Sequence, residues 1–473
     1  MRHILVVAAW LFAAQHATAD LATNTIFTHG ERDDCVCIRI PTLLLVQEVL
    51  VVFADCIPLV GDNCQPTRPH APPPGAVRRQ VYKRSMDGGS TWGAMTNAPE
   101  LGGEPVVLHN GTLLLLSLSS SVLWRSDDGA GTWTRTATIH SSPASGVGGS
   151  LIQLAHTSHP HRLVSVRKGP GGVGEKSALT SYSDDFGLHW HGSTTQQAHM
   201  DETELVELAD GTVAMLSRNW LNCSSIGPDA PCRQHQYAPL SDRARADRLV
   251  PHPRSSRIMH TVSDRPTDAP RAHAPCLALC CAVCRDGPCM CTAIATSDNG
   301  GESFDGPSVP TPSLAGANCH GAALTLGAFT YFAGPLYTGP PRLPNPPQPP
   351  CAYDPESRRT GHCYTDRAPN RVNGTIMVAN ASSAAGVREW RVHTRVTIGS
   401  ACTTVAECDE SAGFGYSSLA ALPQRIWPQH FAIVFETTSP DCGYDPEEHT
   451  ATGIGSATSA CKIVMAVVRK ARV

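Results

Sequence analysis

A phrase of eight residues recurs along this chain, and it restricts the fold more than any other feature of the sequence. It begins with serine, has aspartate or asparagine at its third position with glycine following, and ends with an aromatic residue. The clear copies are SMDGGSTW at 85–92, SDDGAGTW at 126–133, SDDFGLHW at 183–190 and SDNGGESF at 297–304, and SAAGVREW at 383–390 is a worn fifth. The third residue can accept hydrogen bonds from N–H groups of its own turn, and glycine can adopt a positive φ. Each copy therefore predicts a tight turn between two strands.

The spacing of the copies indicates the architecture. Their first serines are 41 (85 to 126), 57 (126 to 183) and 114 (183 to 297) residues apart, and the last gap has room for a unit whose copy has been lost. Units of about 40–50 residues with four strands each are the signature of β-propeller blades. Short apolar and β-branched runs such as TLLLLSLS and FAIVFE recur between turn residues, without long helical spacing, so we predict an all-β chain. The terminal aromatic residues should pack between neighbouring sheets.

The beginning of the chain resembles a targeting segment. A basic residue, an apolar run and small residues at 17 and 19 predict a signal peptide over residues 1–19, and no later run reaches the ~20 apolar residues of a membrane helix. We expect residues 20–473 to form one propeller domain with loop insertions near 222–290 and 339–366. The expected location is the secretory pathway, with the protein secreted or lumenal, as in a lysosome. Four glycosylation sequons fit this location: Asn110, Asn222, Asn373 and Asn380.

Composition excludes some partners and predicts cross-links. A net charge of −4 offers no general attraction to nucleic acid, so we expect no nucleic-acid partner. Nineteen cysteines in an oxidising compartment predict several disulfides, and the odd count leaves at least one thiol over. The cluster from Cys276 to Cys291 could hold zinc, because Cys281 and Cys284 have ligand spacing. It lacks a second well-spaced pair, so we expect disulfides there and no metal site.

Four further motifs, in a fixed order, add a resemblance to a known family. They are IRIPTLL at 38–44, DETELVELADGTVAMLSRN at 201–219, RAPNRVNGTIMV at 367–378 and AGFGYSSLAAL at 412–422, the last leading to the run FAIVFE. Together with the repeated phrases, which have the Asp-box (BNR repeat) spelling S-x-D-x-G-x-T-W, they resemble the exo-α-sialidases, or neuraminidases. That family is built on a six-bladed β-propeller. The resemblance runs from about Cys37 to Glu436.

The resemblance implies three arginines that bind the carboxylate of sialic acid. Arg39 matches the Arg-Ile-Pro signature, Arg218 the Arg-Asn pair after a hairpin, and Arg371 the arginine at the head of a strand. Arg367 and Arg342 are rivals for the third position. A planar, permanently charged guanidinium suits this task because it can bind a carboxylate through two hydrogen bonds.

The resemblance also implies the catalytic residues. Tyr416 matches the nucleophile, and Glu202 matches the glutamate that would take its proton. Glu204 and Glu207 compete with Glu202; Glu204 shares its strand face and Glu207 points the other way, so strand periodicity decides only in part.

The acid/base is expected in a loop after the Arg-Ile-Pro strands. Asp62 is the preferred candidate and Asp55 the alternative. The family usually has a further arginine just after the position of Asp55, whereas this chain has Cys56.

These features predict a secreted, retaining exo-α-sialidase that needs no metal or organic cofactor. Its substrates would be terminal sialic acids on glycoproteins, oligosaccharides or glycolipids, including gangliosides. A sialoside carries a carboxylate on its anomeric carbon, so a neutral phenol meets less charge repulsion than a carboxylate nucleophile would; sialidases are known for using a tyrosine. Two alternatives remain: a trans-sialidase with the same residues, and a non-catalytic, lectin-like propeller that binds sialic acid.

Overall fold

The computed structural model describes residues 23–58, 75, 77–117, 120–139, 150–156, 159–168, 177–198, 200–219, 291–306, 308–315, 319–335, 374–396, 414–437 and 462–471. The predicted signal peptide, the two predicted insertions, and the site residues Asp62 and Arg371 lie outside these residues. So do all the cysteines from Cys276 to Cys289.

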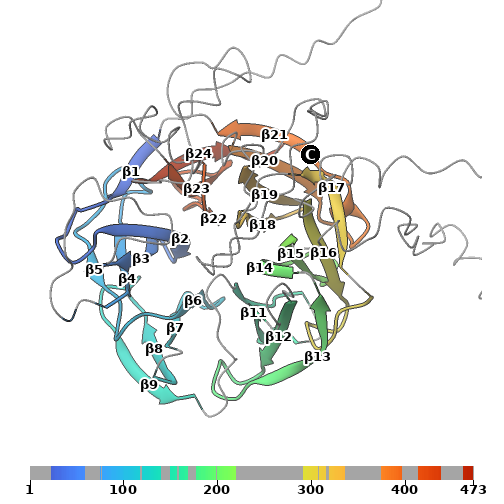
Figure 1. Ribbon diagram of the computed structural model, residues 1–473, viewed down its shortest axis with the longest axis horizontal. Helices are drawn as coiled ribbons and strands as arrows, with labels where there is room; N and C mark the ends of the chain where they lie inside the picture. Colours follow the sequence, from blue (N-terminus) through green and yellow to red (C-terminus); the bar gives the residue numbers. More distant parts are fainter. Residues whose placement is uncertain are drawn as a thin grey trace, which may run out of the picture.

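The described strands form six antiparallel sheets of four strands each, set around a common centre (Figure 1). Sheets one and two contain β2 (Cys37–Val46), β3 (Val49–Ile57), β4 (Arg79–Ser85) and β5 (Thr96–Asn97), then β6 (Glu104–Val107), β7 (Leu113–Ser117), β8 (Val122–Ser126) and β9 (Thr134–Thr138). Sheets three and four contain β10 (Leu151–Gln153), β11 (Leu163–Lys168), β12 (Ser177–Ser183) and β13 (His191–Ala198), then β14 (Met200–Glu207), β15 (Val213–Asn219), β16 (Cys291–Ser297) and β17 (Val309–Ala315). The prediction of a six-bladed β-propeller is confirmed.

The last two sheets complete the ring. Sheet five contains β18 (Ala322–Leu326), β19 (Phe329–Pro335), β20 (Gly374–Asn380) and β21 (Arg391–Val396), with a short 3-10 helix, η3 (Gly386–Arg388), before β21. Sheet six contains β22 (Ser417–Ala421), β23 (His430–Thr437) and β24 (Lys462–Arg469), and its outer strand is β1 (Thr23–Thr28). Strand β1 pairs antiparallel with β24, so strands from the two ends of the described chain share one sheet. No helix in the described part of the chain is long and apolar enough to cross a membrane.

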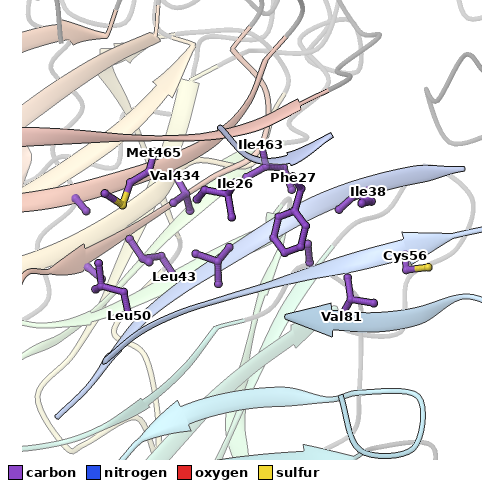
Figure 2. Close-up of a cluster of buried hydrophobic side chains, with 14 of the residues drawn as sticks. Ile26, Phe27, Ile38, Leu43, Leu50, Cys56, Val81, Val434, Ile463 and Met465 are labelled. Carbon is purple, nitrogen blue, oxygen red and sulfur yellow. The ribbon is translucent and has the colours of Figure 1, made fainter. Parts of the chain in front are cut away.

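Apolar side chains fill each junction between neighbouring sheets. The junction of sheets six and one is lined by side chains from both, among them Phe27, Leu43 and Val434 (Figure 2). Successive residues of β3 serve different junctions: Leu50 and Val52 face sheet six, whereas Val51 and Phe53 face sheet two. Because both faces of a blade are buried in this way, its strands read as continuous apolar runs instead of alternating ones.

The four clear repeats form the same hydrogen-bonded turn between the third and fourth strands of a sheet. Each serine Oγ accepts a backbone N–H from four residues onward, at 2.8–2.9 Å. Each third-position side chain does the same: Asp87, Asp128, Asp185 and Asn299 accept at 2.8–3.0 Å. The terminal aromatic residues pack at the sheet junctions, as expected: Trp92, Trp133, Trp190 and Phe304.

The positive φ required by these turns falls on two consecutive residues. In the first copy they are Gly88 and Gly89, with φ of 72° and 97°, and in the third copy Phe186 takes φ 57° in a position that glycine fills elsewhere. The worn fifth copy lacks the acidic residue, and helix η3 stands there instead; its Trp390 still packs between sheets four and five.

One prediction concerns the serine of the first turn. Ser85 is buried, and its hydroxyl accepts the Gly89 N–H at 2.8 Å. Ser85→Ala should lower the free energy of unfolding by about 1–3 kcal/mol, because the buried N–H loses its acceptor. Ser90→Ala, at an exposed position of the same turn, should change it by no more than about 0.5 kcal/mol. Denaturant unfolding of both variants tests this, and equal losses would contradict the role given to Ser85.

Candidate active site

The sequence-predicted residues that the structure describes come from the inner parts of different sheets. Arg39 lies near the start of β2, Glu202 near the start of β14, and Tyr416 directly precedes β22. Each of these three strands is the innermost of its sheet, so their starts collect at one face of the ring (Figure 1). Arg218 lies near the end of β15, which runs antiparallel to β14 and ends beside its start.

A buried hydrogen bond joins Tyr416 to Glu202. The phenol Oη donates to Glu202 Oε1 at 2.5 Å, and Arg218 Nη1 donates to Glu202 Oε2 at 2.9 Å. Both oxygens of the carboxylate are therefore engaged. Glu202 and Tyr416 are each 7% exposed, which places this contact in a region of low dielectric where charge interactions are strong.

The electrostatics of this contact decide where its proton lies. Burial tends to raise the pKa of Glu202, but the charge of Arg218, followed by that of His320 and the Tyr416 hydrogen bond, lowers the pKa to about 2. Burial and the Glu202 charge raise the pKa of Tyr416 far above its ordinary value of 10. The phenol therefore keeps its proton at neutral pH, and Glu202 is an ionised acceptor.

Arg39 reaches the same group of residues and is held by Glu436 of β23. Arg39 Nε and Nη2 donate to the two Glu436 oxygens at 3.2 and 3.1 Å, and both side chains are 2% exposed. The Arg39 guanidinium carbon lies 5.1 Å from the centre of the Tyr416 ring, within the range of a cation–π contact. In the sequence, Glu436 stood out only as the last residue of the run FAIVFE, and its pairing with Arg39 was not predicted.

The backbone beside Arg39 is strained. The pairing of β2 with β3 shifts register between Arg39 and Thr42, and Ile40 has φ 57°, which is rare for a β-branched residue. The Ile40 N–H donates to Glu436 Oε1 at 2.8 Å, so the carboxylate that holds the guanidinium also holds the strained residue. Such strain persists where the surroundings fix the conformation, and this occurs most often at functional sites.

A residue that the sequence analysis did not assign, His320, lies against Tyr416. His320, just before β18, has its ring centre 5.7 Å from that of Tyr416, and its Nε2 lies 3.1 Å from Glu204 Oε1. Glu204 is thus committed to His320, while Glu202 is the carboxylate in contact with Tyr416. Glu207, the other competitor of Glu202, accepts backbone N–H groups from the loop after β10.

A cavity of about 810 Å³ lies in the centre of the ring, and the innermost strands of all six sheets contribute to its wall. Arg39, Glu202, Arg218 and Tyr416 are not part of that wall, but their neighbours Ile40, Glu204, His320 and Ser418 are. The buried residues therefore adjoin the central cavity. Ionisable side chains are common in the wall: Asp55, Arg78, Arg79, Glu104, His156, Glu204, Glu207 and His320.

Asp55, the alternative acid/base, lies opposite Arg39 in the β2–β3 ladder and is ion-paired with Arg78. Cys56, where the resemblance to sialidases led us to expect an arginine, is bonded to Cys35, which gives one of the predicted disulfides. Arg79 lies opposite Cys56 on β4 and enters the cavity wall from there.

One group of potential metal ligands lies together in the described part of the chain. Asp34, Cys35 and Cys56 lie close enough to share an ion, but the two sulfurs form the disulfide and do not offer thiolate ligands.

The chain is similar to known proteins in sequence and in fold. No family model matches the chain. Over 267 residues the chain is 29% identical to a sialidase of Micromonospora viridifaciens, and the match covers 47% of this chain. It covers 40% of that protein, so the chain spans less than half the length of this relative.

Solved structures share the fold at low sequence identity. The Hadza microbial sialidase Hz136 has a TM-score of 0.50 and 14% identity, over 93% of this chain and 67% of that one. The intramolecular trans-sialidase from Ruminococcus gnavus, solved with oseltamivir carboxylate, has a TM-score of 0.50 and 13% identity, over 96% of this chain and 98% of that one. The chain is therefore similar to a sialidase in sequence and to sialidase structures in fold.

Proposed function

We propose that this chain is a retaining exo-α-sialidase, which hydrolyses terminal sialic acids from glycoproteins, glycolipids or oligosaccharides. The observation that carries the proposal is the buried 2.5 Å hydrogen bond from Tyr416 to Glu202, with Arg218 on the same carboxylate and Arg39 beside the phenol ring. The similarity to the Micromonospora sialidase supports it.

Each group has a physical reason to serve this reaction. The substrate carboxylate would be held by Arg39, Arg218 and Arg371, the last outside the described residues. Tyr416 can approach an anomeric carbon that bears a carboxylate because the phenol is neutral. An ordinary tyrosine is a poor nucleophile at neutral pH, so Glu202 must accept its proton during attack.

Substrate binding would itself strengthen Glu202 as a base. In the free protein, the charge of Arg218 holds the pKa of Glu202 to about 2 against the effect of burial. A substrate carboxylate bound to Arg218 would share that positive charge and weaken its hold on Glu202. The affinity of Glu202 for a proton would then rise when the sugar is in place, which couples binding to nucleophile activation.

Two steps complete the proposed cycle. As the Tyr416 oxygen bonds to the anomeric carbon and the glycosidic bond breaks, Asp62 would donate a proton to the leaving oxygen. Water then attacks the anomeric carbon, Asp62 takes its proton, and Glu202 returns a proton to the tyrosine oxygen as that bond breaks. Two displacements give retention. Asp55 is less suited to this role because Arg78 already occupies its carboxylate.

The proposed setting is the secretory pathway. The disulfide between Cys35 and Cys56 suits an oxidising compartment, which agrees with the predicted signal peptide at 1–19.

The function is tested directly with the purified protein. We expect release of sialic acid from a sialyllactose or a fluorogenic sialoside, with an α-anomer as first product by NMR. Added lactose should not divert the sugar; sialyl transfer to lactose would indicate a trans-sialidase instead. Binding of sialic acid without any release would indicate a lectin.

Removal of the phenol oxygen tests the nucleophile. Tyr416→Phe should lower kcat by a factor on the order of 10³ or more, while sialic acid still binds. Tyr82→Phe is a matched control, because this largely buried tyrosine of β4 contacts Trp133 away from the site. Near-normal turnover by Tyr416→Phe would remove this residue from the mechanism.

A pH profile tests the pairing of Arg218 with Glu202. Because the Arg218 charge lowers the pKa of Glu202, Glu202 should stay ionised throughout pH 4–8 in the wild type. In Arg218→Met the pKa should rise by at least about one unit, so the acidic limb of kcat/KM should move to higher pH, with a higher KM. Arg125→Met, at an exposed position paired with Asp127, is the control. An unmoved acidic limb would contradict the assigned coupling.

A further inference from the structure

His320 and Glu204 form a second ionisable pair against the Tyr416–Glu202 couple, and the steps above do not use it. Glu204 follows Glu202 by two residues on β14, next to a register shift of the β14–β15 pairing between Met200 and Thr203. His320 comes from the approach to β18 of the next sheet, and Tyr416 from the approach to β22 of the sheet after that. Three consecutive blades therefore meet at these four side chains.

His320 contacts both Tyr416 and Glu204. Its ring lies beside the phenol ring of Tyr416, with centres 5.7 Å apart and planes inclined by 38°. Its Nε2 lies 3.1 Å from Glu204 Oε1. His320 is 7% exposed, and both His320 and Glu204 line the central cavity. An imidazole buried between a carboxylate and an aromatic ring has little freedom, and it limits the freedom of the ring packed on it.

We propose that His320, anchored by Glu204, is a positioning residue for the Tyr416–Glu202 couple and makes the couple sensitive to pH. The inference rests on the proposed function, because it adds a residue to that reaction.

The charges around His320 explain the sensitivity. It faces Glu202 and Glu204 from β14, Arg218 from β15, Tyr416, and Glu104 at the start of β6. Burial disfavours the imidazolium, but Glu204 and then Glu202 outweigh burial and raise the pKa of His320. With His320 charged, three cations balance three carboxylates: Arg39, Arg218 and His320 against Glu202, Glu204 and Glu436.

Loss of the His320 proton leaves this group of side chains with a net negative charge. An anionic sugar is then repelled, and Glu202 loses a neighbouring cation that helps to keep it ionised. Because the pKa of His320 is raised in the folded protein, the charge is present below that pKa and is lost as the pH rises through it. The alkaline limb of kcat/KM should therefore contain a component from His320.

Glu104 also becomes more negative as the pH rises, so its contribution to the pH profile must be separated from that of His320. Burial, followed by the charges of Asp55 and Glu204, raises the pKa of Glu104 to about 8, so it too becomes negative as the pH rises. The profiles are therefore measured in the wild type and in Glu104→Gln. The neighbouring buried Cys319 also acts on Tyr416 and Arg218 through its charge. The alkaline component that survives in Glu104→Gln and is lost in His320→Gln is therefore the one assigned to His320.

The experiment compares pH profiles of kcat and kcat/KM for wild type, His320→Gln and Glu204→Gln with a fluorogenic sialoside. In Glu204→Gln the alkaline midpoint should move at least about one unit to lower pH, because His320 loses its partner. In His320→Gln this component should vanish, and kcat/KM at pH 6 should fall about tenfold, mainly through KM. His109→Gln, at an exposed position outside the cavity wall, should match the wild type. Alkaline limbs that coincide in all variants would overturn the proposal.

A second measurement keeps the inference separate from the proposed function. Histidine and tyrosine side-chain NMR titrations are recorded on the same proteins, after circular dichroism and melting show that each variant folds. The Tyr416 ring resonances should follow the His320 titration, and Glu204→Gln should move both midpoints together. If the wild type releases no sialic acid, the proposed function fails while this coupling is still decided. Tyr416 resonances that do not respond to the titration of His320 would overturn the inference. If His320→Gln does not fold, Glu204→Gln decides it.

Discussion

The ion pair between Arg39 and Glu436 is the contact on which the remaining arrangement depends. It joins the first sheet to the sixth across 397 residues of sequence, and both side chains are almost fully buried. Burial of two charges is costly unless the geometry is good and further hydrogen bonds complete it. Here Glu436 accepts two bonds from the guanidinium and a third from the backbone of Ile40. The same carboxylate thereby orients a cation, holds a strained backbone and joins the two sheets whose apolar junction is shown in Figure 2.

A second carboxylate, Glu202, organises the chemistry next to this junction. Its two oxygens are divided between a phenol and a guanidinium. In the proposed reaction, this would link activation of the nucleophile to the cation that binds the substrate. The low pKa of Glu202 follows from its neighbours and not from exposure, since burial acts in the opposite direction. A change at any one of Arg218, His320 or Tyr416 therefore alters the base as well as its own contacts.

Much of the architecture could be predicted because it is encoded locally. The repeated phrases specify turns through hydrogen bonds within a few residues. The resemblance of four ordered motifs to the sialidases was enough to select Arg39, Glu202, Arg218 and Tyr416, which the structure brings together. Contacts between blades have no local code. The partner of Arg39, the pairing of His320 with Glu204 and the bond between Cys35 and Cys56 depend on which strands the closed ring sets side by side. The place of β1 in sheet six was likewise not predicted, because TNTIFT carries no signal for its distant partner β24. The assignments of Asp62 and Arg371 remain predictions.

The pairing of β1 with β24 has a consequence for biosynthesis. A ribosome makes β1 before all the other described strands and β24 after them, so the sixth sheet is completed later than the first. Until β24 is made, β1 lacks its partner strand, and in the same way Arg39 waits for Glu436 and Glu202 for Tyr416. A nascent chain can therefore form its early blades one after another, while the contacts of Arg39 and Glu202 between blades form only after the later blades have been made.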